Sequence, residues 1–209
     1  MFKLDKVQFK NILNIESLRL EQNKITAIKG SSGGGKTTFL KLLNNMITPE
    51  KGKITYKEKN IKDFDPALLR REVMMLPQNP KIFKGTIRDN FEKAELIRGG
   101  NLSSPERYNQ LLVQVALTNS LNEQANNLSG GEKQRLALAR IILLEPKVLL
   151  LDEPSSALDQ KTEEKIIKMV VNYIKKNNRT LIMVTHSLQL AEVFADRIIE
   201  IENGKINNK

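Results

Sequence analysis

The sequence predicts an α/β fold built on a mainly parallel sheet. Two apolar runs, "KVLLLDEP" at 147–154 and "TLIMVTH" at 180–186, have the composition of strands buried on both faces. Helical patterns follow each of them, an amphipathic one at 159–178 and a shorter one at 187–195. Strands that alternate with helices in this way are typical of a parallel sheet covered by helices.

Short strands and helices are expected in order through the first part of the chain. A helix is expected at 36–46, where five apolar side chains recur at helical spacing: Phe39, Leu40, Leu42, Leu43 and Met46. The other elements expected here are strands at 7–9 and 25–29, a strand-rich hairpin at 52–61, a short helix at 66–72, and an apolar strand at 73–78 that ends in a Pro-Gln turn.

Residues 80–127 are more polar and mainly helical in pattern, which predicts a helical subdomain inserted into the core of one domain covering 1–209. Its clearest helix is "PERYNQLLVQVAL" at 105–117, with proline in the first turn. A second strong helix is expected at 131–145. The C-terminal stretch at 196–206 reads as a hairpin that turns at Asn-Gly.

Composition excludes several classes of protein. The 209 residues include no cysteine, which excludes a disulfide framework and a cysteine-ligated metal site. Neither the N-terminus nor the most apolar region offers a signal peptide or the roughly 20 apolar residues of a membrane span. The net charge of +10 comes from scattered lysines, and with no tryptophan and three tyrosines the chain lacks an aromatic platform for single strands. We therefore expect no nucleic-acid partner.

The stretch "GSSGGGKTT" at 30–38 lies between an expected strand and an expected helix. A glycine, four residues and then Gly-Lys-Thr is the P-loop spacing. A loop without Cβ atoms can wrap tightly around a phosphate chain, and a helix N-terminus adds unpaired N–H groups. We expect Lys36 to reach the β- and γ-phosphates and the Thr37 hydroxyl to bind Mg²⁺. Further phosphate contacts are expected from Gly30, Ser31, Ser32, Gly33, Gly34, Gly35 and Thr38.

An acid is expected beside this loop. The buried run Val148–Leu151 would present Asp152 at the carboxyl edge of the sheet, where parallel sheets bind ligands. Asp152 could hold Mg²⁺, and the adjacent Glu153 could orient or deprotonate a hydrolytic water. A solvated strand end is the alternative for this pair when it is taken alone.

The stretch "LSGGEKQRLALAR" at 128–140 resembles the signature motif of ATP-binding cassette (ABC) ATPases. "LPQNP" resembles their Q-loop, "LLLDEPSSALD" their Walker B motif and D-loop, and "VTHS" their H-loop, over about residues 5 to 206. This resemblance implies a P-loop NTPase core with a mixed, mainly parallel sheet, an N-terminal antiparallel β subdomain and an inserted helical subdomain. It also implies ATP and Mg²⁺ as ligands and ATP hydrolysis as the activity.

The signature residues Ser129, Gly130 and Gly131 would present N–H groups and a hydroxyl at a helix start. The resemblance implies that this edge faces the γ-phosphate bound to a second copy, so that two chains sandwich two ATP molecules head to tail. A helix capping box formed by Ser129 and Glu132 is a second interpretation, and the two are compatible.

Three further roles follow from the resemblance. Gln78 would touch Mg²⁺ or the lytic water, Asp159 would link the two active sites, and His186 would contact the γ-phosphate and align the water with Glu153. Taken alone, Asp159 could equally cap a helix. One departure is that Asn11 stands near the place where many family members carry an aromatic residue that stacks on adenine, so a strong preference for ATP over GTP is not expected.

The sequence thus predicts the ATPase subunit of an ABC transporter. It would be cytoplasmic, on the inner face of the cell membrane, docked on a separately encoded permease through its helical subdomain and the groove beside Gln78. The stretch "FKGTIRDNF" at 83–91 resembles exporter-type members, which favours export. ATPases of this small size occur in metal-exporting systems, including the iron-export type, so a metal such as iron is a candidate substrate. The alternatives are a non-transport ABC ATPase that acts with soluble partners such as a cluster-assembly complex, and a P-loop kinase, which would leave the signature without a role.

Overall fold

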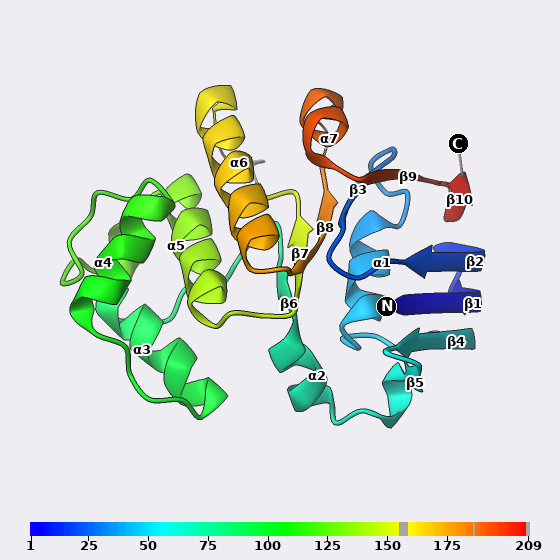
Figure 1. Ribbon diagram of the computed structural model, residues 1–209, viewed down its shortest axis with the longest axis horizontal. Coiled ribbons are helices and arrows are strands. Elements are labelled where there is room, and N and C mark those ends of the chain that lie inside the picture. Colours follow the sequence, from blue (N-terminus) through cyan, green and yellow to red (C-terminus); the bar gives the residue numbers. More distant parts are fainter. Residues whose placement is uncertain (155–158, 186, 208–209) are drawn as a thin grey trace. The chain divides into compact units, whose positions relative to one another are not determined.

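The computed structural model describes residues 1–154, 159–185 and 187–207, and these fall into two compact units (Figure 1). The first, here called the sheet unit, comprises Met1–Met75, Lys147–Glu153 and Val171–Lys209. The second, the helical unit, comprises Leu76–Pro146 and Pro154–Val170. Each unit is described by itself.

The sheet unit contains a six-stranded, mainly parallel sheet, as the alternation of strands and helices predicts. Its strand order is β10-β9-β3-β8-β7-β6. Strand β3 is parallel to β8 and β9, β7 is parallel to β8, and only the hairpin partners β9 and β10 are shown to be antiparallel among the described pairs. The strands are β3 (Ile25–Lys29), β6 (Val73–Leu76), β7 (Val148–Asp152), β8 (Thr180–Val184), β9 (Arg197–Glu202) and β10 (Lys205–Asn207).

The centre of this sheet is apolar on both faces. Every residue of β7 and β8 is buried, in agreement with the continuous apolar runs that predict these strands. The hairpin between β9 and β10 turns where expected: Asn203 and Gly204 have φ values of 47° and 75°, the left-handed conformation that an Asn-Gly hairpin turn requires. Helices α2 (Pro66–Glu72) and α7 (Leu188–Phe194) belong to the same unit.

A second, antiparallel sheet has the order β2-β1-β4-β5. Its strands are β1 (Phe2–Phe9), β2 (Leu13–Leu20), β4 (Lys51–Tyr56) and β5 (Lys59–Asn60). The sequence indicates only residues 7–9 of β1 and nothing of β2. The reason is a bulge: Lys6 has a φ of 48°, and the register shifts between Asp5 and Gln8, so the apolar positions of β1 do not alternate strictly.

Helix α1 (Lys36–Leu43) is three residues shorter than the sequence predicts. Phe39, Leu40, Leu42 and Leu43 are fully buried, but Met46 is 54% exposed. The helix ends because Asn45 adopts the left-handed conformation, with a φ of 54°. The core position expected at Met46 is therefore wrong.

The helical unit is built on α3 (Ile87–Arg98), α4 (Pro105–Gln114) and α5 (Gly130–Leu143). The rings of Phe91 and Tyr108 stack with their centroids 4.9 Å apart. The Tyr108 hydroxyl donates to the buried carboxylate of Glu95, which also accepts from the Ser103 hydroxyl. Helix α6 (Gln160–Lys176) begins in this unit and continues into the sheet unit. Among the described residues, no helix combines the length and apolar character needed to cross a bilayer.

Candidate functional site

The carboxyl ends of three neighbouring parallel strands meet at one edge of the sheet. Ile28 at the end of β3 and Asp152 at the end of β7 both pair with Val184 of β8. The N–H of Thr185 donates to the Ile28 carbonyl at 3.2 Å, which keeps the segment after β8 beside the loop after β3. Ligands of open α/β sheets bind at this edge, so the fold places the glycine-rich loop and the acidic strand end in one site.

The glycine-rich loop runs directly into α1. Gly35 is the N-cap, with a φ of 101°, and its carbonyl accepts the first helical bond, from the Phe39 N–H at 2.8 Å. The preceding helical N–H groups therefore have no acceptor within the helix and carry the positive end of its dipole. The Lys36 side chain is 5% exposed, and its ammonium donates to the carbonyls of Gly30 (3.0 Å) and Ser31 (2.8 Å). The loop carbonyls thus hold the Lys36 ammonium at the N-terminus of α1, a helix end that can bind an anion.

Three of the four glycines in this loop lie close to other protein atoms, and packing excludes a side chain most strictly at Gly30. A Cβ at Gly30 would lie 1.9 Å from the Ile201 carbonyl oxygen. A Cβ at Gly34 would lie 3.1 Å from the same oxygen, and one at Gly35 would lie 2.8 Å from Leu13 Cδ2. At Gly33, with a φ of 75°, no described atom lies within 4 Å of the added Cβ. The sequence-based interpretation, that the glycines are needed to approach phosphate, is incomplete for the three that meet strand β9 or the β1–β2 turn.

Thr37 and Asp152 converge on one point. The Thr37 hydroxyl donates to Asp152 Oδ1 at 3.0 Å, and Asp152 is 3% exposed. Burial raises the pKa of the Asp152 carboxyl, and the hydrogen bond from Thr37 opposes this shift, as do the charges of Lys41 and Lys36.

This pair of oxygens suits Mg²⁺. Hard oxygen ligands are what Mg²⁺ prefers, and it is usually held by one or two carboxylates together with phosphate oxygens. No group of three or more His, Asp or Glu side chains in the described part of the chain is placed to hold a metal.

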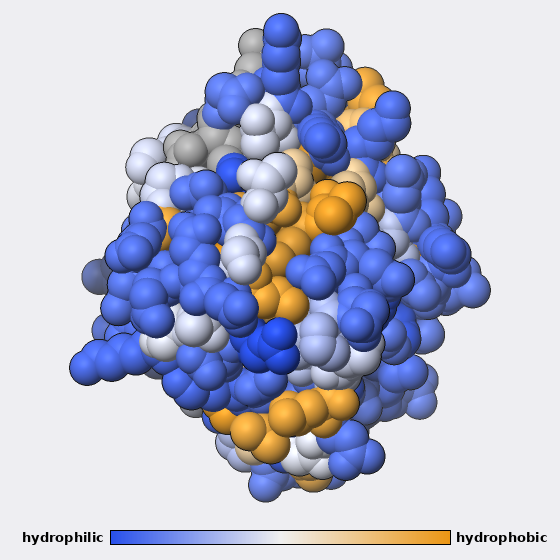
Figure 2. All heavy atoms as spheres, turned by 90° about the vertical axis from the view of Figure 1, so that its left-hand side faces the viewer, coloured by the Kyte–Doolittle hydropathy of each residue, from blue (hydrophilic) through white to orange (hydrophobic). Residues whose placement is uncertain are grey.

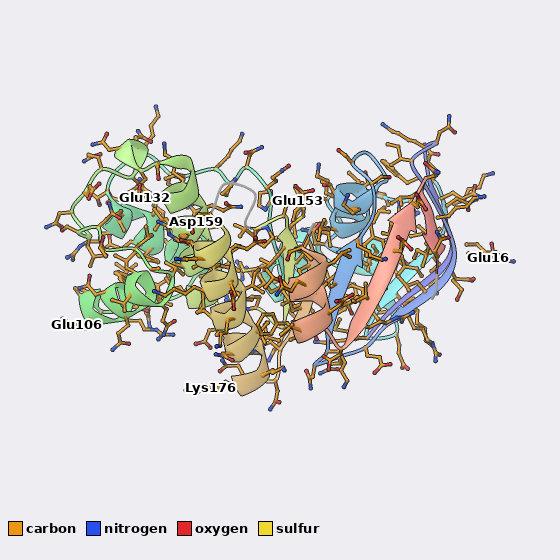
Figure 3. All side chains as sticks on the ribbon, turned by 90° about the horizontal axis from the view of Figure 1, so that it is seen from above. Glu16, Glu106, Glu132, Glu153, Asp159 and Lys176 are labelled. Atoms are coloured by element: carbon orange, nitrogen blue, oxygen red, sulfur yellow. The ribbon has the colours of Figure 1, made fainter. Side chains whose placement is uncertain are left out.

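Glu153, labelled in Figure 3, directly follows Asp152 and has a positive φ. Its φ is 49°, in the left-handed region that a non-glycine residue adopts only at a cost, and its N–H donates to the Val184 carbonyl at 3.2 Å. The chain therefore turns sharply at the strand end, directly after the acid paired with Thr37. His186, the single histidine, lies outside the described residues.

The signature residues open α5 in the helical unit. Ser129 is the N-cap, and the expected capping box is present: Glu132 N–H donates to Ser129 Oγ at 3.4 Å, and Ser129 N–H donates to Glu132 Oε2 at 2.8 Å. The Ser129 hydroxyl also donates to that carboxylate, at 2.7 Å, and these bonds lower the pKa of Glu132. No described atom lies within 4 Å of a Cβ added at Gly130, so the exposed helix start, where Gly131 follows, is open on that side.

Asp159 and Gln78 also belong to the helical unit. Asp159 Oδ1 accepts from the N–H groups of Lys161 and Thr162, each at 3.1 Å, so this side chain caps α6 (Figure 3). The bond from Thr162 and the backbone bonds hold the pKa of Asp159 below its usual range. Gln78 is exposed two residues after β6.

The family model described as ABC transporter matches residues 13–156, which is more than half of the chain. The chain belongs to the ABC transporter family. The lactococcin transport/processing ATP-binding protein LcnC-like of Lactococcus lactis is 38% identical to it over 205 residues, covering 94% of this chain and 28% of that protein. The chain therefore spans only about a quarter of that relative. The tungstate uptake system ATP-binding protein TupC of Peptoclostridium acidaminophilum is 32% identical over 196 residues, covering 93% of this chain and 89% of that protein.

Solved ABC cassettes share the fold. A dimeric post-hydrolysis state of the ATP-binding cassette MJ0796, bound to ADP and phosphate, superposes with a TM-score of 0.87 at 28% identity, covering 100% of this chain and 97% of that chain. A bacterial Atm1-family ABC exporter with ATP bound gives a TM-score of 0.87 at 28% identity, covering 99% of this chain and 38% of that chain. The predicted family and fold are confirmed, and the chain is an ATP-binding ABC ATPase.

The contacts of the loop with Ile201 and with the β1–β2 turn were not foreseen from the sequence. The Asn203-Gly204 turn is recognisable, but no motif or periodicity connects it with the loop near residue 34. The only available signal was the requirement for glycine at positions where backbones approach closely.

Proposed function

We propose that this ABC ATPase binds Mg-ATP between two copies of the chain and uses its hydrolysis to drive a separately encoded permease. The observation that carries the proposal is the hydrogen bond between Thr37 and Asp152 directly beside the glycine-rich loop, because it combines a phosphate-binding helix start with a Mg²⁺-type oxygen pair.

The site residues of the sheet unit each have a role in binding or hydrolysing the nucleotide. Lys36, whose ammonium is held by Gly30 and Ser31, binds the β- and γ-phosphates as a point charge. Thr37 and Asp152 hold Mg²⁺, which neutralises the charge that develops on the phosphates. Glu153 orients or deprotonates the water, and its place directly after Asp152 keeps it near the metal-binding oxygens.

The helical unit supplies the residues that act on the partner copy. The open helix start at Ser129, Gly130 and Gly131 binds the γ-phosphate held by the other chain in a head-to-tail homodimer. Asp159 couples the two sites. Gln78, by contrast, contacts the metal or the lytic water, and His186 contacts the γ-phosphate and aligns the water with Glu153.

The permease docks on the helical unit. Four large apolar side chains of this unit are at least half exposed: Leu96, Ile97, Leu102 and Val113. Figure 2, which faces the side carrying α3 and α4, shows apolar areas within a mainly hydrophilic surface. Exposed apolar areas of this kind are typical of interaction sites, and an amphipathic cytoplasmic helix of a membrane protein would cover them.

Glu153→Gln tests the hydrolytic site. It keeps the shape of the side chain but removes the base, so we expect ATP turnover to fall by at least about a hundredfold while ATP binding persists. The variant should accumulate as a dimer with ATP and Mg²⁺ in size-exclusion chromatography with light scattering. A variant that stayed monomeric under these conditions would contradict the sandwich.

Affinity capture from membranes separates the transport proposal from its alternative. Recovery of a polytopic membrane protein supports transport, and recovery of soluble assembly proteins instead would favour the non-transport function. We propose export as the direction, on the resemblance of residues 83–91 to exporter-type members. A metal such as iron is a candidate substrate. The relatives include a tungstate uptake system, so loading of inside-out vesicles containing the permease is the measurement that decides the direction.

A further inference from the structure

The turn of the C-terminal hairpin makes backbone contacts with two other turns of the sheet unit. The Gly204 N–H donates to the Gly34 carbonyl at 3.3 Å, and the Gly204 carbonyl accepts from the Asn14 N–H at 2.7 Å. A Cβ at Gly204 would lie 2.3 Å from the Ile12 carbonyl oxygen. This residue thus joins the glycine-rich loop to the β1–β2 turn, with no room for a side chain between them.

The bond to Gly34 fixes the orientation of a peptide group in the loop. In a trans peptide the C=O and the following N–H point in opposite directions, and no peptide bond among the described residues is cis. With the Gly34 carbonyl directed at the hairpin, the Gly35 N–H is directed away from it. The Gly34 N–H already donates to the Ser31 carbonyl at 3.1 Å. The bond between Gly204 and the Gly34 carbonyl therefore sets the direction of the Gly35 N–H.

Strand β9 supports the same loop from its own end. The Ile201 carbonyl oxygen would lie 1.9 Å from a Cβ at Gly30 and 3.1 Å from one at Gly34, so the backbones are in close contact on both sides of the loop. Ile201 pairs with Ile206 of β10, and Ile206 packs partly buried against the core of the sheet unit. The hairpin is therefore anchored by its own side chain while its turn contacts the loop.

We propose that the β9–β10 hairpin, through Gly204, is a positioning element that directs the Gly35 N–H at the triphosphate. The inference rests on the proposed phosphate contact of the loop. Gly204 touches no ligand itself; it acts through the Gly34–Gly35 peptide. Displacement of the turn lets this peptide rotate and weakens nucleotide binding without removing any residue of the loop.

The chain contains a matched control for this idea. Gly52 in β4 also has a positive φ, 79°, against 75° at Gly204. A Cβ at Gly52 would lie 2.2 Å from the Lys6 carbonyl oxygen, close to the 2.3 Å between Gly204 and Ile12. Both sites thus hold a left-handed glycine against a carbonyl oxygen, and the clash at Gly52 is the more severe, because a Cβ there would also lie 2.4 Å from the Asp5 carbonyl oxygen. Gly52 contacts the β1 bulge and not a turn beside the loop.

The experiment compares Gly204→Ala and Gly52→Ala in the full chain. The dissociation constant of trinitrophenyl-ATP is measured with Mg²⁺ by fluorescence, alongside urea unfolding and hydrogen exchange of the peptide that contains Gly35. We expect Gly52→Ala to lose at least as much stability as Gly204→Ala. Only Gly204→Ala should weaken binding, by about tenfold, the change that corresponds to losing one net hydrogen bond, and only it should speed exchange at Gly35.

A second pair covers the case in which Gly204→Ala does not fold. Ile206→Ala loosens the hairpin without a clash, and Ile47→Ala removes an equally aliphatic side chain that is partly buried against the same core. We expect about threefold weaker binding in Ile206→Ala and wild-type affinity in Ile47→Ala.

The variant Lys36→Ala distinguishes the two possible failures. If Lys36→Ala weakens binding but the hairpin variants bind as their controls do, the hairpin has no positioning role. If Lys36→Ala also binds like the wild type, the loop does not grip the phosphates, and both the proposed function and this inference are wrong.

Discussion

The close contact between Gly30 and strand β9 leads to a quantitative prediction for Gly30→Ala. The added Cβ would lie 1.9 Å from the Ile201 oxygen, so β3 and β9 would have to separate locally by about 1.5 Å to reach an ordinary contact. These strands are hydrogen-bonded neighbours in the sheet, as the pairing of Ile28 with Ile199 shows, and cannot separate freely. Overpacking of about 1–3 kcal/mol adds to about 1–2 kcal/mol for an alanine at a φ of 144°, so we expect a loss of about 2–5 kcal/mol in the free energy of unfolding.

Two glycines with open surroundings provide the comparison. Gly33 in the same loop and Gly99 at the end of α3 have φ values of 75° and 79°, and no described atom lies within 4 Å of a Cβ added at either. Alanine there incurs backbone strain alone, partly offset by the lower entropy of the unfolded chain, and we expect a loss of about 1 kcal/mol at each.

The assay is urea unfolding followed by circular dichroism in the absence of nucleotide, so that ligand binding cannot influence the result. The packing argument requires Gly30→Ala to be the least stable of the three variants by about 2 kcal/mol. Equal stabilities for Gly30→Ala and Gly33→Ala would refute it, because they would show that the contact with Ile201 does not constrain the loop.

Three further predictions test individual contacts. Thr37→Val should abolish the increase in nucleotide affinity on adding Mg²⁺, whereas Thr37→Ser should keep it; a magnesium titration monitored by nucleotide binding measures both. Tyr108→Phe removes the donor to the buried Glu95 carboxylate and should lower the free energy of unfolding by about 1–3 kcal/mol in urea, with nucleotide affinity unchanged. The Arg140 guanidinium donates to Asn90 Oδ1 (3.0 Å) and to the Lys81 carbonyl (2.8 Å), and a lysine could keep only one of these bonds. Arg140→Lys should therefore lower the free energy of unfolding by about 1 kcal/mol. An unchanged urea midpoint would contradict a role for the planar guanidinium.

The parallel core could be predicted because burial on both faces leaves a simple pattern. Four apolar residues in succession in each of β7 and β8 form runs that a solvated strand would not show, and the acid at the end of β7 lies where the pattern places it. The glycine-rich loop was recognisable for a similar reason: helix start, lysine and hydroxyl are adjacent along the chain, so local spacing carries the geometry.

The antiparallel sheet was expected from the family resemblance and is confirmed, but the residue pattern indicates only parts of its strands, because that pattern depends on pairing. Strand β2 buries Leu13, Ile15, Leu18 and Leu20, with two exposed residues between the second and third, which interrupts the period of two. The interruption in β2 lies opposite the bulge at Lys6 of the partner strand β1. The burial pattern of β2 is therefore understandable only when the two strands are considered as a pair. Likewise the sequence could not show that Asn45 would end α1 early, since the apolar spacing continues to Met46.

The dependence of the loop on distant backbone has a consequence for folding. Gly34 and Gly204 are roughly 170 positions apart, and contacts across such separations form late because closing the intervening chain is entropically unfavourable. The local motif can form its helix start early, but the close contacts at Gly30 and Gly34 exist only after β9 has joined β3. If the loop owes its shape to those contacts, nucleotide affinity appears together with the docking of β9, and not with the formation of α1. In refolding from urea, binding of a fluorescent nucleotide should then follow the slowest phase of β-sheet formation, whereas binding that accompanies the early helical signal would show that the loop shapes itself.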